Sequence, residues 1–147
     1  LFGENTLIEL KESFRIAEGN TNGIPSNRVS PFIDIKTAGN LLQRAGFALS
    51  VSDKDKIQIK YNHPIDLFQE LRLMGETNSL VDRPKNFLRK DILDKTMDVY
   101  ASNFSDKDKK ILATFDIVYL SGWKPHKSQQ KPLKPGAGKV SLSQIFK

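Results

Sequence analysis

The chain has 147 residues, of which 38% are hydrophobic and 27% charged, and its formal net charge is +6. A chain of this length and composition is by default one globular domain with a small core. Because it has no cysteine, the sequence excludes a disulfide framework, a thiolate nucleophile and a thiolate metal site. Its apolar runs are too short to span a bilayer, so we expect no membrane span.

The first residues carry two signals. Leu1-Phe2-Gly3 meets a polar segment at once, which is not how a signal peptide begins. The chain also starts at leucine and not at methionine. We therefore expect that residues have been removed or that the sequence is part of a longer protein.

Positive charge gathers near the C-terminus. Residues 124–139 hold five lysines and no acid. A basic segment favours anionic partners in general, although most such tails are simply solvated. Nucleic-acid binding needs aromatic residues between the basic ones; only Trp123 is near, so nucleic acid is disfavoured as a partner. Three prolines interrupt regular structure there, and we expect a basic, extended tail over residues 125–147 after a domain over residues 1–124.

The first expected element is a helix that begins near Asn5 or Thr6, either of which can cap it. It ends in residues 19–23, where glycine and asparagine tolerate positive φ. Its apolar stripe recurs at helical spacing and consists of Leu7, Leu10, Phe14 and Ala17.

A second helix follows, with Asp34 as its N-cap and Gly46 at its end. Residues 47–52 and 57–61 have the pattern of two strands, and the charged residues 53–56 between them predict a polar turn.

Pro64 suits the first turn of a third helix, which Gly75 closes. A fourth helix is predicted over residues 90–104, and residues 111–120 form the longest apolar strand. Two strands, two helices and a returning strand indicate part of a mixed sheet and not a complete doubly wound unit.

Few residues point to catalysis. His63 and His126 have no partner at the spacing of a local ligand pair, so we expect no metal site. No serine lies in a glycine-flanked elbow, and two histidines offer no triad. Asp116 stands inside an apolar strand, where a carboxylate is paired, exposed or functionally perturbed. The catalytic residues, if any, are unknown.

Two loops remain as binding candidates. Gly136-Ala137-Gly138 has no strand before it and no helix directly after, so it is a poor phosphate cradle, and no cofactor-binding residue is expected. Glu76-Thr77-Asn78 places an acid, a hydroxyl and an amide at a helix end. This loop is either a ligand site or a helix C-cap followed by a capped turn.

Four segments together resemble a known family. They occur in a fixed order: Thr6-Leu7-Ile8-Glu9-Leu10-Lys11 with Ser13; Ser30-Pro31-Phe32 followed by residues 39–47; Met74-Gly75-Glu76-Thr77-Asn78; and residues 121–132. The set resembles the C-terminal half of a class I S-adenosylmethionine-dependent methyltransferase-like family. Its proteobacterial members resemble the biotin-pathway malonyl carrier-protein methyltransferases, and its mitochondrial members are the complex I assembly factor 5 arginine hydroxylases.

The resemblance implies an α/β fold, the C-terminal portion of a Rossmann-like methyltransferase, with a short mixed sheet and about four helices. Residues 1–3 would end its fifth strand, residues 47–52 would lie near the sixth, and residues 111–120 would be the late antiparallel strand. The helices of residues 64–104 would be an insertion over the substrate side.

The implied function is that of a C-terminal part that completes the sheet and the substrate lid. The cofactor loop of the family lies upstream of Leu1, so S-adenosylmethionine is expected in the complete protein and no cofactor in this chain alone. The alternative is a non-catalytic binding or assembly module for a respiratory complex I subunit, which would be its client. Other expected partners are the missing N-terminal half or a second copy. The expected location is the bacterial cytoplasm or, in a eukaryote, the mitochondrial matrix.

Some residues match recurring positions of the family pattern, although no catalytic role transfers to them. The resemblance implies that they face a substrate or partner: Arg28, Ser30, Phe32, Glu76, Thr77, Asn78, Trp123 and His126.

Overall fold

The computed structural model describes residues 1–22 and 26–130. Four helices and two strands make up this part of the chain, which confirms the α/β class and the expected number of helices. In chain order the elements are α1 (Ile8–Asn22), α2 (Ile35–Arg44), β1 (Ala48–Tyr61), α3 (Pro64–Leu73), α4 (Lys90–Asn103) and β2 (Ile111–Trp123). The predicted tail lies mostly in residues 131–147, outside the described residues.

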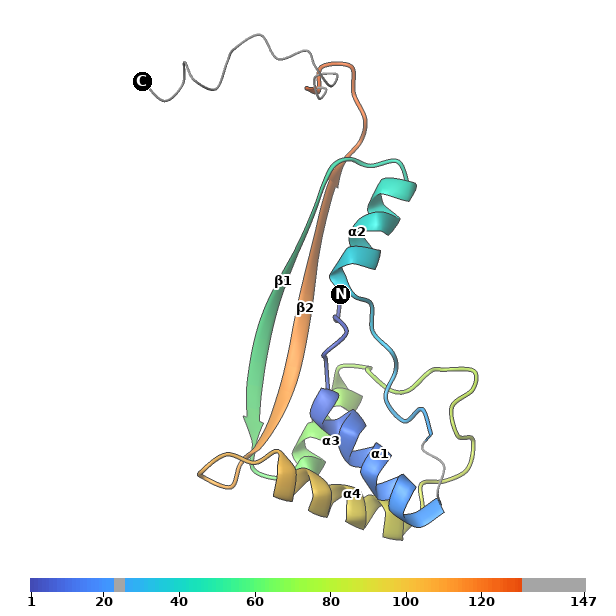
Figure 1. The fold of residues 1–147 in the computed structure, drawn as a ribbon, viewed down its shortest axis with the longest axis vertical. Helices are drawn as coiled ribbons and strands as arrows, with labels where there is room; N and C mark the ends of the chain where they lie inside the picture. The colour runs from blue at the N-terminus through green and yellow to red at the C-terminus, as the bar shows by residue number, and fades with distance from the viewer. Residues whose placement is uncertain (23–25, 131–147) are drawn as a thin grey trace, which may run out of the picture.

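β1 and β2 form a long antiparallel ribbon that runs along the molecule (Figure 1). Pairing extends from Ala48 opposite Trp123 to Tyr61 opposite Ile111. A register shift between Ala48 and Val51 interrupts it, where Leu49 has a positive φ of 51°. Such an irregularity bends the strand and increases its twist.

The predicted turn over residues 53–56 is wrong. These residues continue β1, with Asp53 opposite Tyr119 and Lys56 opposite Asp116. Residues 53–56 are all exposed, so charged side chains cost little at these positions. The segment also contains no glycine, proline or asparagine to turn the chain, and charged side chains are common on edge strands.

Residues 1–3 extend the sheet on the other side of β2. The Gly3 N–H donates to the Asp116 carbonyl at 2.7 Å, and the Val118 N–H donates to the Leu1 carbonyl at 2.8 Å. Phe2 bridges to Ile117 in antiparallel sense, and Gly3 bridges to Ile33 in parallel sense. β2 therefore has a neighbour on each side, as the predicted late antiparallel strand should, and the pairing as a whole is mixed.

The predicted start of the first helix is also wrong, because α1 begins at Ile8. The Thr6 hydroxyl donates to the Asp116 carbonyl at 3.2 Å and accepts the Asp116 N–H at 3.1 Å. The Asn5 side chain likewise bonds to the Asp116 carboxylate. Both predicted caps thus bind the neighbouring strand instead of the helix.

The other helix ends follow the sequence. Asp34 accepts the Thr37 N–H at 2.8 Å as the N-cap of α2. α3 has Pro64 in its first turn and ends at Leu73, with Met74 as its C-cap and Gly75, whose φ is +78°, directly after it. There the Gly75 and Glu76 N–H groups donate to the carbonyls of Arg72 and Leu71, which is the Schellman arrangement. This C-cap fixes the direction in which residues 76–78 leave α3.

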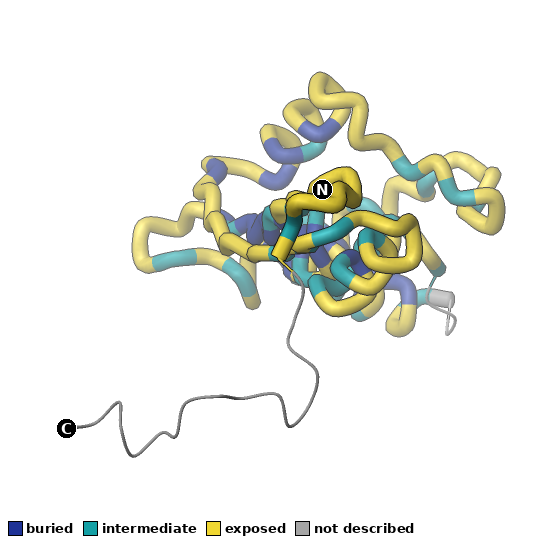
Figure 2. The backbone as a smooth tube through the Cα atoms, turned by 90° about the horizontal axis from the view of Figure 1, so that it is seen from above, coloured by how far each residue is buried: buried dark blue, intermediate teal, exposed yellow. Residues whose placement is uncertain are grey.

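The core lies at one end of the ribbon, where α1, α3 and α4 gather (Figure 1). Exposed segments predominate when the molecule is seen from above (Figure 2). α2 alone packs along the other end, where Gly39 approaches Ser52 so closely that a Cβ would lie 3.1 Å from its Oγ. The buried core cluster comprises Leu7, Leu10, Phe14, Tyr61, Leu67, Leu71, Tyr100, Ile111, Ala113 and Phe115.

Among the helices that the structure describes, none has the length and apolar character needed to cross a membrane.

Candidate functional site

A small cavity of about 70 Å³ lies between the start of α1, β2 and the two loops that follow α1 and α3. Phe2, Leu10, Leu71 and Phe115 supply much of its apolar wall. Six of the eight residues expected to face a substrate or partner line it, namely Arg28, Ser30, Phe32, Glu76, Thr77 and Asn78. The fold thus brings together two loops about 50 residues apart in sequence.

Trp123 and His126 lie elsewhere. Phe115 lines the cavity, and Trp123 is eight residues further along β2, a separation of about 26 Å for an extended strand. The Trp123 side chain is exposed. His126 lines a shallow hollow with Ala48 and Lys127, and its Nδ1 lies 2.8 Å from the Ser128 hydroxyl. In this structure the two residues form no common site with the cavity.

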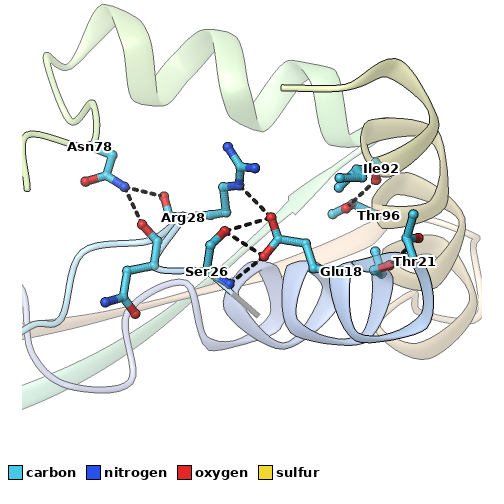
Figure 3. Close-up of polar contacts among 9 residues, drawn as sticks. Glu18, Thr21, Ser26, Arg28, Asn78, Ile92 and Thr96 are labelled. Carbon is cyan, nitrogen blue, oxygen red and sulfur yellow. Dashed lines mark hydrogen bonds and ion pairs between the residues drawn. The ribbon is translucent and has the colours of Figure 1, made fainter. Parts of the chain in front are cut away.

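Glu18, near the C-terminal end of α1, organises one wall of the cavity. Its side chain is buried, yet its carboxylate is fully engaged (Figure 3). It accepts the Ser26 N–H at 2.6 Å, the Ser26 hydroxyl at 2.6 Å and the Arg28 Nε–H at 2.8 Å. Burial alone would raise the pKa of the Glu18 carboxyl, but these bonds from Ser26 and Arg28 outweigh it and hold the pKa below its usual value. Glu18 is therefore ionised at neutral pH.

The position of Glu18 in the sequence indicates that its side chain is buried. It lies four residues after Phe14 and next to Ala17, so it continues the buried stripe of α1. An acid on such a stripe requires a partner, since buried carboxylates are almost always paired.

The ion pair with Glu18 engages one edge of the Arg28 guanidinium. Nε is bonded to Glu18, whereas Nη1 and Nη2 have no hydrogen-bond partner among residues 1–22 and 26–130. Figure 3 shows the Nη end of the guanidinium directed away from the Glu18 carboxylate. The Arg28 side chain is 18% exposed. Its two Nη groups are thus donors available to a ligand.

Asn78 ties the two loops to each other. Its Nδ2 donates to the carbonyls of Asn27 at 2.7 Å and Arg28 at 3.0 Å (Figure 3). Its Oδ1 accepts the Leu80 N–H at 3.1 Å, as in a capped turn. The amide is therefore engaged with backbone. Glu76 and Thr77 make no side-chain hydrogen bond within the described part of the chain, so the loop is both a C-cap with a capped turn and a cavity wall.

A wider groove of about 380 Å³ adjoins the cavity and shares Arg28, Leu10 and Leu71 with it. This volume lies within the range of small-ligand sites. Its walls are mostly apolar, with Arg72 and Glu76 among its charged residues. The cavity and groove together could hold an apolar group with a charged end.

Besides Glu18, the buried acids of the described residues are Glu9 and Asp116, and both make structural contacts. Asp116 is 1% exposed and accepts the Asn5 side chain at 2.8 Å, with the Lys54 ammonium 3.6 Å away. Of its possible roles, pairing is therefore the one observed. The buried Glu9 carboxylate accepts the N–H and the hydroxyl of Thr114. Among the described residues, no group of three or more potential metal ligands occurs.

No family model matches the chain. Individual proteins are nevertheless similar to it over nearly its whole length. It is 42% identical over 146 residues to "Arginine-hydroxylase NDUFAF5, mitochondrial" of Dictyostelium discoideum, a match that covers 99% of this chain and 33% of that protein. The human protein of the same name is 37% identical over 147 residues, covering 100% of this chain and 42% of that protein.

A more distant relative is the malonyl-[acyl-carrier protein] O-methyltransferase of Nitrosospira multiformis. It is 31% identical over 124 residues, which cover 84% of this chain and 38% of that enzyme. The chain thus spans less than half the length of the relatives it matches. It is a homologue of the NDUFAF5 arginine hydroxylases and, more distantly, of the malonyl-[acyl-carrier protein] O-methyltransferases.

Proposed function

We propose that the chain is the C-terminal part of an S-adenosylmethionine-dependent methyltransferase-like protein of the NDUFAF5 type. It completes the central sheet and covers the substrate site, while the loop that binds S-adenosylmethionine belongs to the rest of the protein. Its location is then the mitochondrial matrix in a eukaryote or the cytoplasm in a bacterium.

The observation that carries this proposal is the pairing of residues 1–3 with β2. Three sheet positions lie side by side in the order β1, β2, residues 1–3, and the parallel bridge from Gly3 to Ile33 adds a fourth contact. In a Rossmann-like sheet the next strands would continue from this edge, which supports a role in completing a larger sheet.

The exposed apolar residues support the same proposal. Ile57 and Ile59 of β1 are 42% and 37% exposed and, with Phe2 and Ile117, line an apolar hollow of about 180 Å³. Exposed patches of this kind mark surfaces that meet another protein part. Its occupant in the proposal is the remainder of the protein, and self-association of the isolated chain is the expected substitute.

The proposed cover consists of α3, α4 and residues 76–78. Leu71 and Glu76 line the cavity, and Leu88 and Leu93 extend the adjoining groove. These residues follow β1 in the chain and return to β2, so they form an excursion between the two strands of the ribbon. An excursion that walls a cavity is suited to select a substrate.

A split protein tests the proposal. The Dictyostelium relative, shortened by the segment that matches this chain, is expressed with the 147-residue chain, and S-adenosylmethionine binding is measured by calorimetry. We expect a one-to-one complex that binds the cofactor, whereas the chain alone does not. Stoichiometric, micromolar binding by the chain alone would refute the proposal. The relative's own segment, supplied in trans, is the positive control; success with that segment and failure with this chain would also count against it.

The alternative is a non-catalytic module that holds a respiratory complex I subunit. It is suggested by the family resemblance and by the exposed Arg72 and Glu76 at the groove. It predicts that the 147-residue chain binds its client without S-adenosylmethionine and loses the client when residues 129–147 are deleted, with unchanged circular dichroism. Client binding that requires the cofactor-binding part would favour the main proposal.

A further inference from the structure

We propose that one face of the β1–β2 ribbon is the docking surface for an amphipathic helix that brings lysine or arginine to Asp53 and Asp55, and that the rest of the protein supplies this helix. The inference rests on the proposed function and deepens it, because it names the face, the element that covers it and the charge of that element. This surface, here called the uncovered face, consists of Val51, Asp53, Asp55, Ile57 and Ile59 of β1 with Ile117 and Tyr119 of β2.

The opposite face of the ribbon is covered by α1 and α2. Side chains alternate between the two faces of a strand, and the even-numbered ones meet these helices. The Thr114 hydroxyl of β2 is bonded to Glu9 of α1, and a Cβ added to Gly39 of α2 would lie 3.1 Å from the Ser52 Oγ of β1. The odd-numbered side chains of residues 51–59 therefore point away from both helices.

The uncovered face is apolar at both of its ends. Val51 and Tyr119 are 59% and 55% exposed at one end. At the other end Ile57, Ile59 and Ile117 line the hollow of about 180 Å³ that α3 borders. Exposed apolar surface of this extent marks a place where another part of a protein packs.

The sheet arrangement points to a helix as the covering element. Residues 1–3 and β1 both pair antiparallel with β2, so they run parallel to each other. Parallel strands are connected by crossovers, usually helices, which lie on the faces of the sheet. From Val51 to Ile59 the face is about 26 Å long for an extended strand, which is the length of a helix of about 18 residues.

Two carboxylates in the middle of the uncovered face determine the charge of this helix. Asp53 accepts the neighbouring Lys54 N–H at 2.8 Å, and the Asp55 carboxylate has no hydrogen bond or ion pair within the described part of the chain. Lys54 does not neutralise them, because its ammonium lies on the other face, 3.6 Å from Asp116. A carboxylate that is removed from water needs a positive partner. The covering helix therefore carries lysine or arginine at this level.

A second copy of the chain fits this face poorly. Two identical copies associate through the same patch on each. Asp53 and Asp55 of one copy would then lie against the same carboxylates of the other, with like charges opposed. The rest of the protein is a better source, because the segment that matches this chain makes up only 33% of the Dictyostelium relative and 42% of the human one.

The first test places single cysteines on the two faces of β1 and measures their rate of labelling by a maleimide. The chain has no cysteine of its own, so each label reports one position. In the split complex with the shortened Dictyostelium relative, Val51→Cys and Ile59→Cys should react about tenfold more slowly than in the chain alone, because a covered thiol is inaccessible. Lys56→Cys and Gln58→Cys are the matched controls on the other face, and their rates should change by less than about twofold.

The second test examines the charge of the helix with the 147-residue chain alone. The probe is a synthetic helical peptide of about 18 residues, with leucine on one side and lysine on the other, and its control has glutamate in place of lysine. The lysine peptide should protect Ile59→Cys from the maleimide and the glutamate peptide should not, although the net charge of +6 would by itself attract the glutamate peptide. Asp53→Asn combined with Asp55→Asn should weaken this protection about fivefold, whereas Lys56→Gln should not weaken it.

Three results would overturn the inference: equal protection by the lysine and glutamate peptides, protection of the even-numbered positions as strong as that of the odd-numbered ones, or protection in the chain alone that increases with its own concentration, as a second copy would cause. A split complex that binds S-adenosylmethionine while Val51→Cys and Ile59→Cys react as in the chain alone also refutes the inference and leaves the proposed function standing. A split complex that protects these two positions but does not bind S-adenosylmethionine supports the docking surface and refutes the proposed function.

Discussion

The Asn5 side chain donates from Nδ2 to the Asp116 carboxylate at 2.8 Å, across 111 residues of sequence. The Asn5 backbone N–H approaches the same oxygen at 3.3 Å, and the Lys54 ammonium lies 3.6 Å away. Asp116 therefore fastens the segment before α1 to the middle of β2.

The first prediction follows from this contact. Asp116→Ala should lower the free energy of unfolding by about 1 to 3 kcal/mol, because it leaves the half-buried donors of Asn5 without their acceptor. Asp116→Asn keeps one acceptor oxygen and should cost less. Denaturant titration gives both values. Asp53→Ala, on the exposed face of β1, is the control and should change stability by less than about 0.5 kcal/mol. An equal effect of the two alanine variants would contradict the role of Asp116.

The second prediction concerns pH and Glu18. Its pKa is lowered in the folded chain, so its contribution to stability is present above the unfolded value of about 4.3 and is lost as pH falls through the folded pKa. Glu18→Gln should therefore cost about 1 to 3 kcal/mol at pH 7 and progressively less below pH 4. Unfolding curves at several pH values measure the difference. A cost that does not depend on pH would mean that the carboxylate charge is not what stabilises this corner.

The third prediction compares two glycines. Gly75 has a φ of +78°, so Gly75→Ala should cost about 1 kcal/mol and disturb the residues that follow it. Gly19 lies inside α1, and a Cβ added there meets no atom within 4 Å. Gly19→Ala should therefore stabilise the chain by about 0.5 to 1 kcal/mol. Thermal unfolding should show a lower melting temperature for Gly75→Ala and a higher one for Gly19→Ala. A change in the same direction for both variants would argue against the role of Gly75 in the C-cap.

The fourth prediction concerns two buried tyrosines. Burial, followed by the nearby Glu70, raises the pKa of Tyr61, whose hydroxyl has no hydrogen-bond partner among the described residues. Burial, followed by the charge of Glu9, raises the pKa of Tyr100. Because the pKa values of both tyrosines are raised in the folded chain, their contribution to its stability is complete below about pH 10. That contribution is lost as pH rises further.

Absorbance titration near 295 nm should show two of the three tyrosines ionising only well above the ordinary value. Tyr61→Phe and Tyr100→Phe should each remove one of these late transitions. Tyr61→Phe should also leave stability unchanged or slightly higher, since it deletes an unpaired buried hydroxyl. Titration of all three tyrosines together near pH 10 would contradict the burial of both.

Where local chemistry decides the structure, the sequence was a sufficient guide. Asp34, Pro64 and Gly75 marked helix ends correctly, because a cap acts within four residues of itself. The Asn5 and Thr6 prediction failed for the opposite reason. Their oxygen and amide groups could cap a helix equally well, and only the presence of β2, more than 100 residues later, gave them better partners.

The candidate site shows the same division. The family pattern supplied Arg28 and residues 76–78 but could not reveal Glu18, whose partners lie in a loop that has no periodic pattern. It also grouped Trp123 and His126 with the rest. Residues that recur together in sequence need not meet in space, and a long ribbon separates these two from the cavity.

The uneven burial along the ribbon has a consequence for how the protein opens. Among the β1 residues only Tyr61 is buried, and it lies at the end that α1, α3 and α4 enclose. Backbone amides near Tyr61 and Ile111 can exchange with solvent only when the core itself unfolds, whereas those near Ala48 and Trp123 are released by a smaller, local opening. The two strands should therefore separate first at the end where only α2 packs on them, and last at the end that the core encloses.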